Sequence, residues 1–298
     1  MKYRRLGKTQ LQVSAVGIGT WQLGNHWGKH FNQSEVSDIF AHGAELGINL
    51  VDTAECYGHH VSESFIGEAL KSSRERWIIA TKFGHNRASD LPAEAHWQPE
   101  QVQLQLEASL RALQTDYIDI YQFHSGTREQ LDNDALWTML NKQVQAGKIR
   151  FLGISIGQPN QLYQVDRATA LGVSVIQTIY NAINTKAADA VLPSCQRQDL
   201  GVLARVPLAS GFLSGKYQPD TIFPDNDVRA ERKPEVNQQQ IEQALQVLQH
   251  VPVGVDPASW ACAWCLQHPA ISSVIPGIKS IAQLQSNAHS ADLSIDQN

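Results

Sequence analysis

Short apolar runs alternate with longer amphipathic segments along most of the chain. The apolar runs have strand length, while the segments between them repeat apolar residues at helical spacing. The expected strands are residues 15–19, a run ending at Asp52, and residues 77–82, 117–124, 149–155, 173–177, 201–205 and 271–275. The expected helices open near 32, cover 62–70, open at 99, end near 147, open near 159, and cover 187–198, 236–249, 257–267 and 280–289.

The alternation of eight strands with helices predicts an α/β protein with a (β/α)8 TIM barrel. No shift in composition divides the strands, so we expect a single barrel domain spanning residues 1–298. An open doubly wound sheet is the alternative, but that fold needs fewer βα units. Residues 2–13 form two short runs around a Gly-Lys-Thr turn and predict a short N-terminal β-hairpin.

Composition removes several classes of function. The formal net charge is -5 and no predicted helix carries a basic stripe, so we expect no nucleic-acid partner. No run of about 18 apolar residues is present, and Met1 to Gly7 lack the apolar stretch of a secretory signal. We therefore expect a cytoplasmic protein without a membrane partner. The sequence does not fix the oligomeric state.

Neither the cysteines nor the histidines form a recognisable metal-binding pattern. Cys262 and Cys265 have CxxC spacing, but they lie in an apolar helical segment without a second ligand pair, which favours core packing. The adjacent His59 and His60 lack the carboxylates or cysteines that would complete a site. We expect them to be solvent-exposed loop histidines and predict no bound metal.

Four polar residues of complementary chemistry fall where strands end, which is where barrel enzymes place their active sites. Asp52, Lys82 and His124 end three successive expected strands, and Tyr57 follows Asp52 on the same loop. Tyrosine titrates near pH 10, so a neighbouring cation is needed to stabilise its phenolate. We hypothesise that Tyr57 is a general acid whose pKa Lys82 lowers, that Asp52 keeps Lys82 charged, and that a neutral His124 hydrogen-bonds the substrate oxygen.

Each of these residues also has a structural interpretation. Asp52 and Lys82 could form a structural ion pair at the rim, and His124 could simply end its strand. The presence of all four residue types at adjacent strand ends favours the catalytic interpretation.

Several motifs in order resemble the blocks of the aldo-keto reductase family, from the start of the chain to residue 287. They are Asp52-Thr53-Ala54 with Tyr57-Gly58, Ser62-Glu63 and Gly67; Ala80-Thr81-Lys82; Asp116 to Asp119 with Tyr121 and His124; Gly147 to Arg150 with Gly153 and Ser155; Pro207 to Gly211; Gly215 to Tyr217; and Ile275-Pro276-Gly277 with Gln283 and Asn287. The resemblance implies NAD(P)H-dependent reduction of small aldehydes or ketones, with Asp52, Tyr57, Lys82 and His124 as the catalytic set.

The resemblance also implies where the cofactor is held. Ser155 and Gln177 match the carboxamide ligands, the segment from Pro207 to Lys216 matches the pyrophosphate loop, and Lys279 matches the position that contacts an adenosine 2'-phosphate. A cation there favours NADPH or NADP+ over NADH. The full implied set is Gly19, Thr20, Trp21, Asp52, Ser155, Gln177, Arg205, Pro207, Leu208, Ser210, Gly211, Lys216, Gly277, Lys279, Gln283 and Asn287.

Two positions depart from the family pattern. Ile156 follows Ser155 where a polar residue is common, which predicts looser cofactor binding. Arg205 stands where many members have an aromatic ring stacked on the nicotinamide. A guanidinium can stack on a planar ring, but its charge changes the electronics there, and the alternative is that it faces an anionic substrate or a phosphate.

The expected substrate lid consists of the loops 22–31, 84–98 and 211–234. Their aromatic and histidine residues are expected around the same rim: Trp21, Trp27, His59, His60, His85 and Trp97. Two other functions stay open at this point. One is a cofactor-binding sensor or regulatory barrel with little turnover, and the other is a metal-independent barrel isomerase or lyase.

Overall fold

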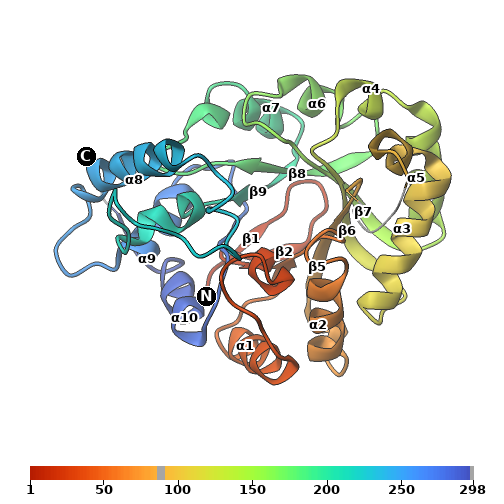
Figure 1. The fold of residues 1–298 in the computed structure, drawn as a ribbon. Helices are drawn as coiled ribbons and strands as arrows, with labels where there is room; N and C mark the ends of the chain where they lie inside the picture. Colours follow the sequence, from red (N-terminus) through yellow and green to blue (C-terminus); the bar gives the residue numbers. More distant parts are fainter. Residues whose placement is uncertain (86–90, 296–298) are drawn as a thin grey trace.

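The computed structural model describes residues 1–85 and 91–295, and its centre is a parallel eight-stranded barrel (Figure 1). Neighbouring strands follow the order of the chain: β3 (Ile18–Gly19), β4 (Leu50–Asp52), β5 (Ile78–Phe83), β6 (Ile118–His124), β7 (Ile149–Ser155), β8 (Val173–Ile179), β9 (Gly201–Arg205) and β10 (Ser273–Ile275). Single bridges from Val16 to Val274 and from Gly19 to Gly277 close the sheet. The predicted (β/α)8 barrel is confirmed.

Helices surround the strands, as Figure 1 shows. They are α1 (Gln33–Glu45), α2 (Val61–Leu70), α3 (Pro99–Ala112), α4 (Arg128–Leu131), α5 (Asp134–Gln145), α6 (Leu162–Arg167), α7 (Val191–Arg197), α8 (Pro234–Leu248), α9 (Pro257–Leu266) and α10 (Ile281–His289). A capping box begins α1 where the helix was expected to open, since Asn32 and Glu35 bond each other's backbone N–H groups. The apolar faces of the helices pack on the outer faces of the strands and form the main core.

The predicted hairpin closes one end of the barrel. It consists of the antiparallel strands β1 (Tyr3–Arg5) and β2 (Gln12–Ser14). Leu6 and Val13 are fully buried against side chains from the barrel interior, among them Leu50 and Ile120. Because the hairpin plugs the end where the strands begin, the open end is the one where they finish.

Several element boundaries differ from the sequence prediction. The strand expected over 15–19 has only two residues in ladder pairing, because the barrel closes through single bridges there. The helix expected over 187–198 is divided into a 3-10 turn, Lys186–Ala188, and α7. The helix expected near Pro159 begins at Leu162, after a turn. These differences leave the strand ends that carry the candidate site in place.

Candidate active site

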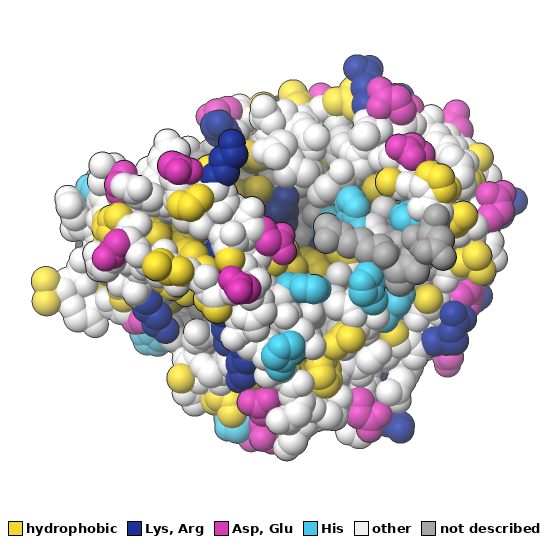
Figure 2. All heavy atoms as spheres, in the orientation of Figure 1, with side chains coloured by type: hydrophobic (Ala, Val, Ile, Leu, Met, Phe, Trp, Pro, Cys, Tyr) yellow, Lys and Arg dark blue, Asp and Glu magenta, His cyan; other side chains and the backbone are white. Residues whose placement is uncertain are grey.

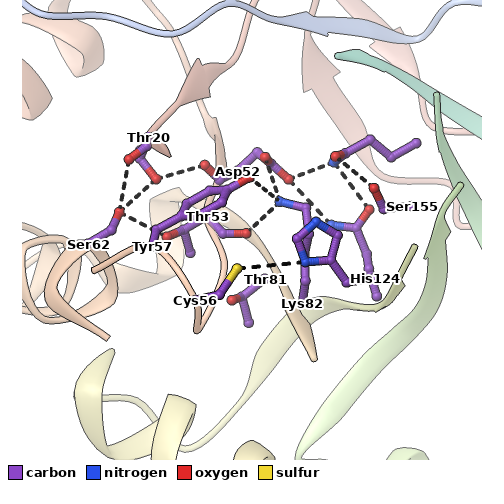
Figure 3. Close-up of polar contacts among 12 residues, drawn as sticks. Thr20, Asp52, Thr53, Cys56, Tyr57, Ser62, Thr81, Lys82, His124 and Ser155 are labelled. Atoms are coloured by element: carbon purple, nitrogen blue, oxygen red, sulfur yellow. Dashed lines mark hydrogen bonds and ion pairs between the residues drawn. The ribbon is translucent and has the colours of Figure 1, made fainter. Parts of the chain in front are cut away.

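The four candidate catalytic residues meet at the open end of the barrel. Asp52 is the last residue of β4, Lys82 lies near the end of β5 and His124 is the last residue of β6. Tyr57 lies in the turn between β4 and α2. Figure 3 shows their side chains converging from these neighbouring elements. The sequence prediction that they form one cluster agrees with their placement.

The ammonium group of Lys82 is the centre of the cluster. Its side chain is fully buried, and Nζ donates to Asp52 Oδ2 at 2.8 Å, to the carbonyl of Thr53 at 2.7 Å and to the Tyr57 hydroxyl at 3.4 Å. An ammonium has three N–H donors, so each one has an acceptor. Lys82 therefore connects a carboxylate to the Tyr57 hydroxyl in a fixed geometry.

The second carboxylate oxygen of Asp52 is held by two amides. Asp52 Oδ1 accepts from Gln177 Nε2 at 2.7 Å and from Gln122 Nε2 at 3.4 Å. Ser155 Oγ donates to Gln177 Oε1 at 3.2 Å. Sequence reasoning missed Gln122, which lies beside Lys82 in the β5 and β6 register. These hydrogen-bonded side chains fix the orientation of Asp52, and hence of the Lys82 ammonium that it faces.

The surroundings shift the pKa values of Lys82 and Tyr57. Burial alone lowers the pKa of Lys82, but attraction to Asp52 and Tyr57 outweighs it, so the pKa is raised and the ammonium stays charged. Burial raises the pKa of Tyr57 to about 12, although Lys82 pulls it downward. The expectation that Lys82 lowers the pKa of Tyr57 is right in direction. The expectation of a tyrosine pKa moved toward neutrality is wrong for the protein alone, because desolvation of the phenolate is the larger effect.

His124 faces a thiol and a second imidazole. Its Nδ1 lies 3.9 Å from Cys56 Sγ, and its ring meets that of His85 edge to face, with centroids 4.9 Å apart. Trp21 stacks on the phenol ring of Tyr57 at a centroid distance of 6.0 Å. Aromatic and imidazole side chains therefore line the same cavity as Tyr57.

We call Asp52, Tyr57, Lys82 and His124 the tetrad. Two buried acids close to it in the sequence, Glu55 and Glu63, were not anticipated. Glu55 is almost fully buried and accepts from the His85 N–H at 2.8 Å, and burial raises its pKa to about 8. Glu63 is also buried and bonds Thr81 Oγ1 and His60 Nδ1. The expectation of an exposed His60 is therefore wrong, because the buried Glu63 carboxylate requires a partner. His59 is exposed as expected.

A cavity of about 980 Å³ extends from the tetrad toward α10. Figure 2 shows this face of the molecule hollowed near its centre, with histidine side chains beside the hollow. Every sequence-predicted catalytic and cofactor residue lines the cavity except Lys82 and Ser155, which are fully buried behind it. Of the expected rim residues, Trp21, Trp27, His59 and His85 line it, whereas His60 and Trp97 do not. Residues 86–90 of the expected lid loop lie outside the described residues.

The long loop after β9 pairs with the loop after β3 along one wall of the cavity. Val228 N donates to the His26 carbonyl at 2.9 Å, and Gly28 N donates to the Asn226 carbonyl at 3.1 Å. We call the two paired segments, residues 26–28 and 226–228, the strap. The sequence predicted a functional loop here but gave no signal for its partner.

Arginines next to the strap were also missed, although they stand out as charges within the glycine- and proline-rich loop. Arg229 pairs with the buried Asp227 at 2.7 Å and donates to the Ser210 carbonyl. Arg232 donates to Ser210 Oγ at 3.1 Å. Burial, and then repulsion by Arg229, lower the pKa of Arg232. An anion bound near Ser210 would relieve that repulsion.

Lys279 lies at the same wall. Its Nζ donates to the Trp27 carbonyl and lies 3.9 Å from Asp227 Oδ2. Its backbone N–H donates to Gln283 Oε1 at 2.7 Å, so two predicted cofactor residues are linked directly. Lys216, the other predicted phosphate contact, is exposed at the cavity edge.

The polar groups along the cavity suit a long ligand with anionic and amide groups. Asn287 Nδ2 and Arg205 Nε are buried cavity-lining donors without a hydrogen-bond partner among the described residues. A Cβ at Gly277 would lie 2.2 Å from the Gln22 side-chain amide, so the Gln22 side chain would have to move. In the same described ranges, no cluster of side chains suited to a metal ion is present, and no helix is long and apolar enough to cross a bilayer. The donor set fits a nicotinamide dinucleotide.

Comparison with known proteins gives matches over nearly the entire chain. The model of the Aldo/keto reductase family matches residues 15–298. YqkF of Bacillus subtilis, an uncharacterized oxidoreductase, is 29% identical over 98% of this chain and 92% of that protein. L-galactose dehydrogenase of Arabidopsis thaliana is 30% identical over 96% of this chain and 87% of its own length.

Solved structures agree with the sequence matches. The holo form of aldo-keto reductase AKR11C1 from Bacillus halodurans has a TM-score of 0.81 and 28% identity, covering 100% of this chain and 93% of that one. Glycerol dehydrogenase AKR11B4 from Gluconobacter oxydans has a TM-score of 0.82 and 26% identity, covering 99% and 91%. The structural similarity thus spans the whole barrel.

Replacing Lys82 by methionine should strongly destabilise the protein. The Asp52 carboxylate would remain buried without its cation, at a cost of about 3–5 kcal/mol in the free energy of unfolding. Adding Asp52→Asn should recover part of this loss, because the unpaired charge is removed. Urea denaturation of the single and double variants measures the coupling. Lys71→Met, at an exposed ion pair with Glu68, is the control and should change little. A K82M protein as stable as wild type would contradict the role of Lys82 as the cation that compensates the buried Asp52 carboxylate.

Proposed function

Because the chain belongs to the aldo/keto reductase family, we propose that it reduces small aldehydes or ketones to alcohols with NADPH, using Tyr57 as the general acid. The family and the holo neighbour support an oxidoreductase that uses a nicotinamide cofactor on small carbonyl compounds. The observation that carries the finer proposal is the contact of Lys82 Nζ with both Asp52 and the Tyr57 hydroxyl. The proposed location is the cytoplasm.

Bound NADPH would supply the hydride that reduces the carbonyl carbon. The Tyr57 hydroxyl donates a proton to the carbonyl oxygen, which becomes the alcohol oxygen. Lys82 stabilises the negative charge left on the phenol oxygen, and Asp52 keeps Lys82 charged and aimed at it. His124 lines the cavity at the next strand end and orients the substrate oxygen.

The raised pKa of Tyr57 suits this role. A phenol with a pKa of about 12 carries its proton at neutral pH, so almost every molecule is ready to act as a donor. The same burial makes the phenolate costly, and the buried Lys82 reduces that cost as the proton leaves. The site therefore holds a proton firmly until a substrate oxygen develops negative charge.

The cavity residues suggest how the cofactor is oriented. Gln177, with Ser155 behind it, is placed beside Asp52 for the carboxamide, and Gly19, Thr20 and Trp21 form the adjacent wall. Residues 207–211 and Lys216 would hold the pyrophosphate, with Arg232 supplying a cation next to Ser210. Lys279 is proposed to contact the 2'-phosphate, with Gln283 and Asn287 on the adenine side.

Tyr57→Phe should lower turnover of an aldehyde panel by about 10²–10⁴-fold, because the proton donor is lost. Binding of NADPH should remain close to wild type, since the ring is kept. Cofactor absorbance measures turnover, and quenching of tryptophan fluorescence measures binding. Tyr3→Phe, at a half-exposed tyrosine outside the cavity, is the control.

The same panel separates the alternatives. Full turnover by Y57F would overturn the role of Tyr57. Tight NADPH binding without turnover by wild type would instead favour a sensor, and no nicotinamide binding at all would favour an isomerase or lyase.

The two reaction directions should depend on pH in different ways. Carbonyl reduction needs protonated Tyr57, so ionisation of this residue should not reduce kcat below about pH 9. Alcohol oxidation needs the phenolate, whose fraction grows about tenfold per pH unit below the pKa, so its rate should rise through this range. Steady-state rates in both directions test this. A falling limb of kcat for reduction centred near pH 7, absent in Y57F, would contradict the raised pKa of Tyr57.

Lys279→Ala should weaken NADPH binding by about tenfold or more while changing NADH binding little, because the two cofactors differ in the 2'-phosphate and a charge-assisted hydrogen bond is lost. Fluorescence titration gives both dissociation constants. Lys142→Ala, at an exposed position on α5, is the matched control. An equal loss of affinity for NADPH and NADH would show that Lys279 only supports the strap, through its hydrogen bond to the Trp27 carbonyl.

A further inference from the structure

Arg205 places a fixed cation across the open end of the barrel. It is the last residue of β9, yet its Nη2 donates to the carbonyls of Ile156 at 3.1 Å and Gly157 at 3.0 Å, just after β7. Since β8 lies between these strands, the side chain crosses the last residues of β8, where Gln177 is paired with Ser155 and Ile179 with Arg205. The guanidinium is therefore held over the strand ends that carry Ser155 and Gln177.

The charge of Arg205 is close to the tetrad and is not neutralised by an ion pair. Burial lowers the pKa of Arg205, while attraction to Tyr57 and Asp52 opposes that shift. In the described part of the chain its hydrogen-bond acceptors are backbone carbonyls and no carboxylate pairs with it. The charge of Asp52 is already balanced by Lys82. One net positive charge therefore remains at this end of the cavity.

We propose that Arg205 makes the protein bind the reduced nicotinamide cofactor more tightly than the oxidised one. This inference rests on the proposed function. A hydride can reach a carbonyl carbon whose oxygen contacts Tyr57 only if the nicotinamide ring lies next to Tyr57, which places the ring close to Arg205 as well. The ring is cationic in NADP+ and neutral in NADPH, and the rest of the two molecules is identical. A neighbouring cation therefore repels the oxidised form selectively.

The consequence concerns the direction of the reaction. The forward reaction converts a carbonyl compound, NADPH and a proton into an alcohol and NADP+. A cation that destabilises bound NADP+ shifts the equilibrium between bound species toward carbonyl and NADPH, which favours alcohol oxidation. It also favours release of NADP+. Arg205 thus sets the redox balance of the bound cofactor, a role that an uncharged aromatic residue at the same strand end would not fill.

The test measures dissociation constants of NADPH and NADP+ by isothermal titration calorimetry. For wild type, the ratio of the NADP+ constant to the NADPH constant should exceed about ten. Arg205→Gln should lower this ratio about tenfold, which corresponds to about 30 mV in the potential of the bound two-electron couple. Arg205→Lys keeps the charge and should keep most of the ratio.

Arg232→Gln is the matched control, because Arg232 lines the cavity next to Ser210 rather than next to Tyr57. This variant should weaken the binding of NADPH and of NADP+ by the same factor, so the ratio of the two dissociation constants should not change. Thermal unfolding verifies that each variant folds, and Arg205→Met, which keeps the apolar stem, replaces R205Q if that variant does not.

The outcomes separate this inference from the proposed function. Failure of wild type to bind either form would overturn both. Binding of both forms with a wild-type ratio near one, or with a ratio that R205Q leaves unchanged, would overturn the role of Arg205 and leave the proposed function standing. Equal weakening of both forms in R205Q would show that Arg205 serves only to shape the wall.

Discussion

The structure of the site depends on burying the ammonium group of Lys82. A charge without water needs both an opposite charge and a hydrogen-bond acceptor for every N–H. Asp52, the Thr53 carbonyl and the Tyr57 hydroxyl meet these needs. Because all three acceptors lie between the end of β4 and the turn that follows it, the position of Tyr57 follows from where β4 stops. The requirement to satisfy one cation thus fixes the position of the Tyr57 hydroxyl, the proposed proton donor.

The same requirement extends outward through successive layers. Asp52 needs donors for its second oxygen, and the amides of Gln177 and Gln122 provide them from β8 and β6. On the other side, Thr81 on β5 bonds the buried Glu63, which in turn bonds His60 at the start of α2. Polar side chains from several strands therefore fill the barrel interior at the open end. Apolar side chains of the hairpin and the strands fill the opposite end.

Sequence reasoning located the strand ends and therefore the tetrad, since the period of the apolar runs and the rule for barrel ends are local signals. It could not find Gln122 or the role of His60, because these depend on which side chains face one another across strands. The pKa of Tyr57 was misjudged for the same reason, as desolvation depends on depth below the surface. The pairing of residues 26–28 with 226–228 joins segments about two hundred positions apart and has no local signal.

The charges along the cavity differ from one end to the other, and this asymmetry suggests the ligand. At the tetrad, Asp52 offsets part of the charge of Lys82, but the ammonium group still attracts a phenolate at Tyr57. Away from the tetrad, Asp227 offsets Arg229 and Asp256 attracts Lys216, while Arg232 adds a positive charge next to Ser210. A ligand that places its phosphates at the positive end and its reacting ring at Tyr57 gains attraction without disturbing the acid. Arg205 is the exception to this separation, since it brings a cation to the reacting end, where only the oxidised ring would be repelled.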